Sequence, residues 1–276
     1  MPKILVSTLS AAILSGLALI PAGLAARGAQ GTPASTAANA APPDFSGVYY
    51  PVQQGRGGQG QRAGAPPAGA PRGGPPPRPT TSAPLSDGSQ GRSPDAPSLR
   101  PEYMAKWEMM RKSRMAGSYE FDNNAKCLPP GMPAMMGMAY GMEVMQTKDK
   151  ITFFSELNDA LRRVYLDGRQ PTPKILDDPT YAGYSTGHWE GDTLVVDTVA
   201  LHPDSFIEGF TPHSDAMTVK ERIRFIGPGL LEDRITVTDP KALTRPWETV
   251  RTYRKAAPGN DQLRECACAE GLTREK

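Results

Sequence analysis

Residues 218–238 read TVKERIRFIGPGLLEDRITVT, two runs of alternating apolar and polar residues on either side of a Gly-Pro-Gly sequence. Alternation with a period of two is typical of a β-strand that has one face in a core and the other in water. Gly227-Pro228-Gly229 is a tight-turn sequence between the two runs. This stretch therefore predicts a β-hairpin formed by residues 218–226 and 230–238.

Further runs of the same kind begin at residue 142, and short turn sequences rather than helical patterns connect them. Strands so close together in the sequence favour an antiparallel meander over a βαβ fold. About nine or ten such strands can close into a barrel, which removes the exposed edges of the sheet. We therefore predict a mostly-β fold, a lipocalin-like antiparallel β-barrel, with a two-sheet sandwich as the alternative. The additional strands are predicted at residues 142–147, 151–156, 161–166, 183–189, 193–198, 249–254 and 262–269.

One α-helix is predicted after residue 100. Pro101 suits the first position of a helix, and Gly117 is a typical end signal. Between them, Tyr103, Trp107 and Met110 follow the i, i+4, i+7 spacing that places side chains on one helical face. We expect this face to pack against the barrel.

The first 26 residues have the composition of a cleaved signal peptide. Lys3 is followed by an almost unbroken apolar run that ends before Pro21, and small residues surround Ala25 and Ala26. The run is short for a membrane anchor, and no later segment is apolar enough to cross a bilayer. We therefore expect a periplasmic or secreted protein with no membrane span after cleavage.

Composition divides the remainder of the chain into ordered and disordered parts. Residues 27–43 and 52–99 are rich in Gly, Pro and Ala, and such a composition cannot bury enough apolar surface to offset the entropy of ordering. Residues 44–51, DFSGVYYP, form a compact apolar run between them and predict the first strand of the β domain. Residues 52–99 are then a disordered low-complexity insertion, residues 100–271 hold the barrel, and residues 272–276 form a tail.

The charge distribution argues against a nucleic-acid partner. The net charge is +2, but residues 101–276 hold 23 Lys and Arg against 26 Asp and Glu, so the basic excess lies in the first 100 residues. A nucleic-acid platform needs a basic folded face with stacking aromatic side chains, and this basic region has neither. The sequence predicts no particular oligomeric state.

The three cysteines are Cys127, Cys266 and Cys268. An exported protein meets an oxidising compartment that permits disulfides. Cys266 and Cys268 are two residues apart and share one face of a strand, which makes them poor partners for each other. A disulfide between Cys127 and Cys268, with Cys266 left over, is the preferred interpretation.

Several blocks resemble the motifs of a large, mostly uncharacterised family of exported bacterial proteins. The most specific is WEGDTLVVDT at residues 189–198, and the PHSD motif follows at 212–215. Two further blocks are CLPPGMP at 127–133 and RVYLDGR at 163–169. The resemblance supports the fold and export predictions and favours Cys268 as the structural cysteine, but it implies no activity.

Glu221 is a candidate site residue because it shares a strand face with apolar residues and so points toward the expected core. A buried carboxylate needs a cation or hydrogen-bond donors, and Arg162, Arg163 and Tyr165 on another strand are candidate partners. The functional interpretation makes Glu221, Arg163 and Tyr165 ligand contacts. The alternative is an ion pair that fixes strand register or a position at the barrel mouth.

His213 and Asp215 are candidates because they lie together in a loop before a strand, where catalytic and binding residues are common. His213 suits proton transfer or ligand contact, with Asp215 or Glu221 as its partner. The alternative is that Ser214 or Asp215 caps the strand entry while His213 packs on the surface.

A metal site is the weaker interpretation of the methionine-rich segment. Thioethers favour copper(I), and Cys266 and Cys268 add soft ligands. Methionine also fills irregular gaps in apolar cores, and the chain has three histidines and no H-E-x-x-H motif. We therefore favour packing or a pocket wall, with no metal or other cofactor, for Met132, Met135, Met136, Met138, Met142 and Met145.

Three functions follow from this sequence. The first is a protein that binds a small apolar or aromatic molecule, with Arg163, Tyr165, His213 and Glu221 as polar contacts. The second is a periplasmic hydrolase or isomerase that uses His213 as a general base with Asp215 or Glu221. The third is an envelope structural or interaction module.

Overall fold

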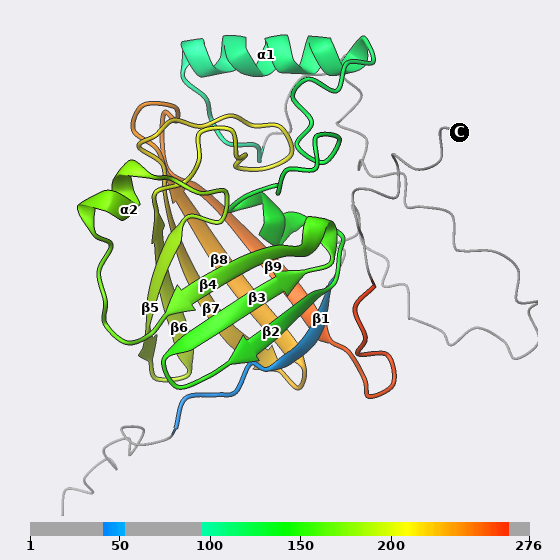
Figure 1. Ribbon diagram of the computed structural model, residues 1–276, viewed down its shortest axis with the longest axis vertical. Coiled ribbons are helices and arrows are strands. Elements are labelled where there is room, and N and C mark those ends of the chain that lie inside the picture. The colour runs from blue at the N-terminus through cyan, green and yellow to red at the C-terminus, as the bar shows by residue number, and fades with distance from the viewer. Residues whose placement is uncertain (1–40, 53–94, 265–276) are drawn as a thin grey trace, which may run out of the picture. The chain divides into compact units, whose positions relative to one another are not determined.

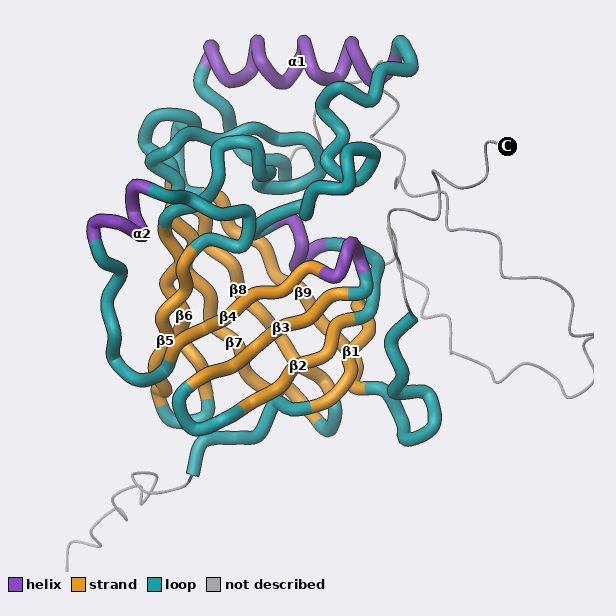
Figure 2. Tube along the Cα trace, in the orientation of Figure 1, coloured by secondary structure: helices purple, strands orange, loops and turns teal. Residues whose placement is uncertain are grey.

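The computed structural model describes residues 41–52 and 95–264, and these residues form a closed nine-stranded β-barrel. Each strand pairs with its neighbour in the sequence, and β1 closes the barrel by pairing with both β2 and β9 (Figures 1 and 2). The barrel prediction is confirmed, and the two-sheet sandwich is wrong. The strands are β1 Gly47–Pro51, β2 Met142–Gln146, β3 Lys150–Ser155, β4 Ala160–Tyr165, β5 Tyr184–Glu190, β6 Thr193–Val199, β7 Thr218–Gly227, β8 Leu230–Thr238 and β9 Trp247–Lys255.

The predicted hairpin has the longest run of paired residues in the sheet. β7 and β8 pair antiparallel from Thr218↔Thr238 to Gly227↔Leu230. The turn needs Gly229, whose φ of +64° lies in the left-handed region that glycine adopts without strain. Val219, Glu221 and Ile223 are buried while the residues between them are exposed, as the alternation predicts.

One connection departs from the predicted antiparallel meander. β4 and β5 run parallel and pair through two residues only, Val164↔Ser185 and Tyr165↔Thr186. Residues 166–183 cause this because they carry the chain back to the opposite end of the barrel before β5 begins. The seam between β4 and β5 therefore has the shortest backbone ladder of the barrel.

The helix α1, Pro101–Met115, confirms the predicted helix, and its Trp107 and Met110 are buried. The structure adds elements that periodicity missed, the short helix α2, Pro173–Asp177, and the 3₁₀ helices η1, Ala134–Gly137, and η2, Leu157–Asp159. Thr172 accepts a hydrogen bond from the Ile175 amide, and Pro173 follows it, so α2 has a helix-start sequence. Figure 1 shows α1 above the loops that cover one end of the barrel.

The core lies inside the barrel, where the inward faces of the strands meet. Its fully buried apolar side chains come from most strands and from the loops over one end, and they include Phe45, Tyr49, Met132, Phe153, Val164, Val196, Ile223 and Ile235. Residues 95–99 also contact the barrel, since Leu99 pairs with Leu243 and the Trp247 indole donates to the Asp95 carbonyl at 2.7 Å. Within the described ranges, no helix has the length and apolar character needed to cross a membrane.

Parts of several predictions lie outside the described residues. The signal peptide at 1–26, the tail at 272–276 and most of the two predicted disordered segments are among them. Of the predicted strand at 262–269, residues 262–264 are described and are not a strand. Cys127 is disulfide-bonded, but Cys266 and Cys268 both lie outside the described residues, so the pairing with Cys268 stays a prediction.

Candidate functional site

Glu221 lies inside the barrel, as its position on β7 predicted, and forms a buried ion pair with Arg162 of β4. The Arg162 Nη1 donates to Glu221 Oε1 at 2.8 Å, and its Nη2 donates to the second carboxylate oxygen. Both side chains are fully buried. The Arg162 guanidinium also donates to two hydroxyls on the intervening strands, Ser185 Oγ of β5 at 3.2 Å and Thr198 Oγ1 of β6 at 3.1 Å. This cluster connects four consecutive strands through the interior.

Asp233 on β8 is a buried carboxyl that the sequence analysis missed. It is fully buried, and neither of its carboxylate oxygens has a hydrogen-bond partner in the described part of the chain. Burial raises the pKa of Asp233 well above its usual range, and the neighbouring Glu221 carboxylate raises it further. Burial and the neighbouring Glu221 carboxylate therefore both favour the protonated form of Asp233. Its signal was present in β8, where Leu231, Asp233 and Ile235 share one face.

His213 is buried in the loops over the barrel and is hydrogen-bonded through both ring nitrogens. Its Nδ1 lies 2.6 Å from the Ser214 carbonyl oxygen, which can only accept, so Nδ1 carries the proton. The neutral ring then accepts from the Ser205 hydroxyl through Nε2, at 2.8 Å. Burial holds the pKa of His213 below its usual value and so keeps this neutral tautomer.

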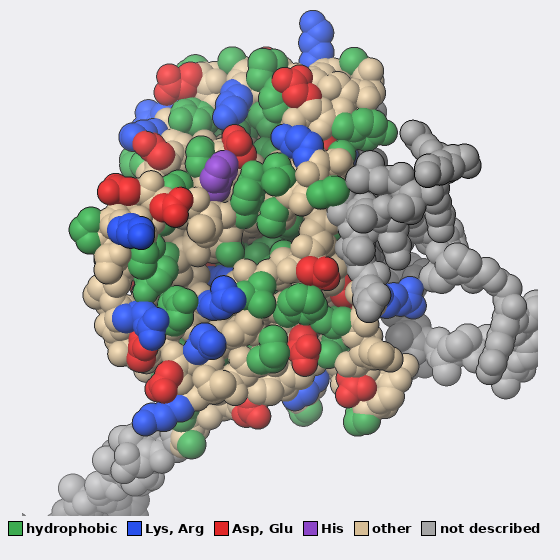
Figure 3. Space-filling model, viewed as in Figure 1, with side chains coloured by type: hydrophobic (Ala, Val, Ile, Leu, Met, Phe, Trp, Pro, Cys, Tyr) green, Lys and Arg blue, Asp and Glu red, His purple; other side chains and the backbone are tan. Residues whose placement is uncertain are grey.

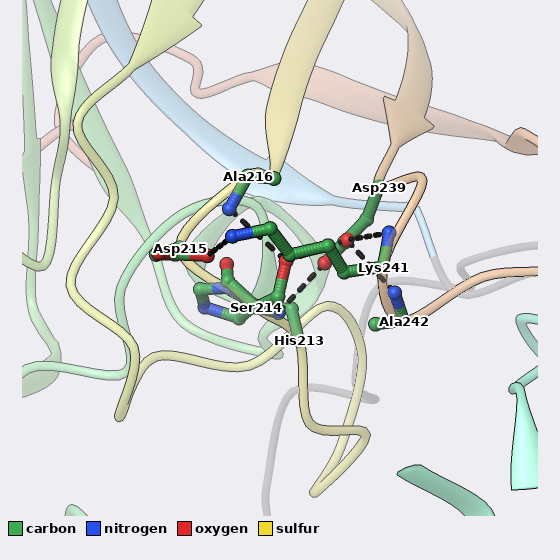
Figure 4. A network of polar contacts seen from close by, with 7 residues as sticks. All are labelled: His213, Ser214, Asp215, Ala216, Asp239, Lys241 and Ala242. Atoms are coloured by element: carbon green, nitrogen blue, oxygen red, sulfur yellow. Dashed lines mark hydrogen bonds and ion pairs between the residues drawn. The ribbon is translucent and has the colours of Figure 1, made fainter. Parts of the chain in front are cut away.

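The neighbours of His213 form a turn that Asp239 organises (Figure 4). The Asp239 carboxylate accepts from the Ser214 amide and hydroxyl, both at 2.7 Å, and from the amides of Lys241 and Ala242. The Asp215 side chain is 74% exposed and pairs with Lys241 at 2.7 Å. The salt bridge holds the pKa of the Asp215 carboxyl below its usual value through the hydrogen bond from Lys241.

The three predicted catalytic residues do not bond to one another. Among the described residues, His213 bonds Ser205 and Ser214, Asp215 bonds Lys241, and Glu221 bonds Arg162. His213 and Glu221 therefore hold loops and strands together. The structure brings together the remaining two predicted residues, Arg163 and Tyr165, at a different place.

Arg163 and Tyr165 lie on the outer face of β4 and line a groove beside the parallel seam. The groove has a volume of about 420 Å³. Its walls are β4 along its whole length, residues 180–184 at the start of β5, and the loop before η1 together with η1 itself. Figure 3 shows hydrophobic side chains, a class that there includes tyrosine, gathered on the middle of this face, with Lys and Arg side chains below them. The lining residues are Pro129, Gly131, Met135, Ala160, Leu161, Arg163, Tyr165, Thr180, Tyr181, Ala182, Gly183 and Tyr184.

Three tyrosines give the groove aromatic walls. The rings of Tyr165 and Tyr184 lie 5.3 Å apart at 32°, so strands on both sides of the seam contribute one ring each. The Tyr181 ring stacks on His202 at 4.6 Å, and burial raises the pKa of Tyr181. These contacts hold the rings in place while their hydroxyls have no protein partner among the described residues.

The methionine-rich segment packs into the core rather than facing one centre. Met132, Met135, Met136 and Met142 are buried core residues, whereas Met145 is 41% exposed on β2. Over the described ranges, the structure contains no group of three or more His, Cys, Asp or Glu side chains placed to hold a metal ion. The burial of these four methionines in the core supports the packing interpretation.

The sequence matches no family model and no curated protein. Among solved structures, the chain is similar to the crystal structure of a point mutant of the fluorescent protein UnaG, at 17% sequence identity. The similarity covers 50% of this chain and 88% of that chain, with a TM-score of 0.27. The resemblance to exported bacterial proteins stays a prediction.

Replacing Arg162 by Met should lower the free energy of unfolding by about 3–5 kcal/mol, because Glu221 is left as a buried charge without its cation. Urea unfolding followed by circular dichroism measures this change. The control Arg222→Met removes the exposed pair with Glu190 and should cost at most about 1 kcal/mol. Adding Glu221→Met to Arg162→Met should recover much of the loss, and equal losses in the two arginine variants would contradict the assignment.

The thermal stability of the protein should fall as the pH drops below 6.5, the ordinary pKa of histidine. The unfolded chain takes up a proton on His213 there, while the folded chain resists it to lower pH, so protons favour unfolding. Melting temperatures between pH 8 and pH 5 measure the fall, which should be smaller in His213→Gln. His188→Gln is the control, because the His188 side chain is 60% exposed, and in this variant the fall in melting temperature should be as large as in the unmodified protein. An unchanged fall in His213→Gln would refute the interpretation.

Proposed function

We propose that this protein binds a small aromatic molecule in the outer groove beside the β4–β5 seam. The observation that carries the proposal is a groove of about 420 Å³ with three tyrosines in its lining. Ligand sites in proteins commonly measure about 300–1,000 Å³ and combine aromatic walls with a few polar groups. The groove therefore has both the size and the chemistry of a site for a molecule of one or two rings.

The barrel interior is the usual ligand site of a small barrel, but here side chains occupy it. Arg162 reaches from β4 across to Glu221 on β7, and apolar side chains from the other strands surround the pair. A guest inside would have to displace a buried ion pair, which costs several kcal/mol (about 3–5). The outer groove requires no such displacement, and for this reason we place the ligand there.

Export belongs to the same proposal. The N-terminal composition of Lys3, a long apolar run and small residues near Ala26 supports it. A cleaved, exported barrel would meet its ligand outside the cytoplasm. The disulfide at Cys127 fits an oxidising compartment.

The neutral probe 2-naphthamide should bind the full chain, and Tyr184→Ala should weaken this binding about 2- to 10-fold. Loss of ring contacts worth about 0.5–1.5 kcal/mol gives this factor. Probe fluorescence during titration measures the affinity. Tyr119→Ala is the matched control, since Tyr119 is 70% exposed and lies outside the groove. Absence of binding, or equal affinity in both variants, would overturn the proposed function.

When the full chain is expressed in a bacterium, the protein in the envelope fraction should begin near residue 26. N-terminal sequencing measures this start. Leu17→Arg places a charge in the apolar run and should leave the uncleaved chain in the cytoplasmic fraction. An intact Met1 terminus on the envelope protein would contradict export by cleavage.

A further inference from the structure

Arg163 is the charged side chain of the groove lining, which contains no acidic residue. Most arginines on the barrel strands have a carboxylate partner, as the pairs Arg162–Glu221, Arg222–Glu190 and Arg251–Glu208 illustrate. The Arg163 side chain lies on the exposed face of β4 and has no ion pair or hydrogen bond in the described part of the chain. The groove therefore presents an uncompensated positive charge beside its tyrosine rings.

From this geometry we propose that the ligand of the groove is an aromatic carboxylate, held by its ring packed on the tyrosines and by its carboxylate on Arg163. This inference rests on the proposed function and names the chemical class of the ligand. A guanidinium donates two parallel hydrogen bonds to a planar carboxylate, which is the strongest of the ordinary charge-assisted contacts. A cationic ligand would be repelled, and a neutral one would leave the Arg163 charge without a partner.

The spacing of Arg163 and Tyr165 along β4 suits an aromatic carboxylate. Arg163 and Tyr165 are two residues apart on the same face, which places their Cβ atoms about 6.6 Å from each other along the strand. A ring that packs on Tyr165 and Tyr184 then has its substituent carboxylate within reach of the long Arg163 side chain. The ring pair at 5.3 Å fixes where the aromatic part lies, since it joins the two sides of the seam.

Other charges near the groove do not replace Arg163. Arg169 lies over the Tyr165 ring at 4.2 Å, but Asp167 holds it through hydrogen bonds and offsets its charge. The hydrogen bond from Arg169 holds the pKa of the Asp167 carboxyl below its usual value, so the pair stays ionised and compensated. Arg163 is thus the cation of this lining that is free to receive an anion.

The test compares 2-naphthoate with its neutral isostere 2-naphthamide on the full chain at pH 7. Naphthoate should bind about tenfold more tightly, and this preference should shrink at high ionic strength because salt screens an exposed charge. In Arg163→Gln the two probes should bind equally. The matched control is Arg254→Gln, because Arg254 is also an exposed strand arginine with no ion pair among the described residues but lies on β9, outside the lining.

The outcomes separate the two proposals. Equal affinity of the two probes for the unmodified chain, with both weakened by Tyr184→Ala, would overturn the carboxylate class and leave the groove as the site. A naphthoate preference that survives in Arg163→Gln would overturn the role of Arg163. Binding of both probes that is insensitive to Tyr184→Ala would overturn the proposed function itself.

Discussion

The buried ion pair between Arg162 and Glu221 is the interaction on which the rest of the structure depends. Two charges inside a barrel are stable only when each is paired and the remaining donors are hydrogen-bonded. Ser185 and Thr198 meet this requirement, because they take the guanidinium protons that Glu221 leaves free and bond to each other at 2.8 Å. The position of β4 relative to β5, β6 and β7 is therefore fixed by one side chain.

This constraint matters most at the parallel seam. The backbone ladder between β4 and β5 has two residue pairs, whereas Arg162 reaches Ser185 from the inside at the same level of the barrel. Side-chain bonds in the interior thus replace backbone bonds that the seam lacks. The groove lies beside this short ladder on the outside, between β4 and the residues that lead into β5. Arg162 and Arg163 are adjacent in the sequence and serve opposite faces, one closing the seam inside and the other lining the groove outside.

The period-two pattern identified every strand from β2 to β9 and the hairpin of β7 with β8, because apolar alternation reports directly on burial. It also placed Glu221 inside the barrel. It did not decide between Arg162 and Arg163, because both faces of β4 are partly apolar. Leu161 and Tyr165 share the face of Arg163, and Ala160 and Val164 share the face of Arg162. It missed α2 and hence the parallel direction of β5, because a five-residue helix leaves almost no periodic signal. Asp233 was missed although it carried the same signal as Glu221.

His213 illustrates why a loop histidine beside an aspartate does not by itself indicate catalysis. Its neutral ring connects the Ser214 turn, which Asp239 holds, to Ser205. Ser205 lies directly behind Gly131, where a Cβ atom would overlap it, and Gly131 is part of the groove lining. The loops that carry PHSD and CLPPGMP therefore meet at the back wall of the groove. A residue that sequence reasoning selected for proton transfer acts, in this fold, by holding in place the wall against which a ligand would bind.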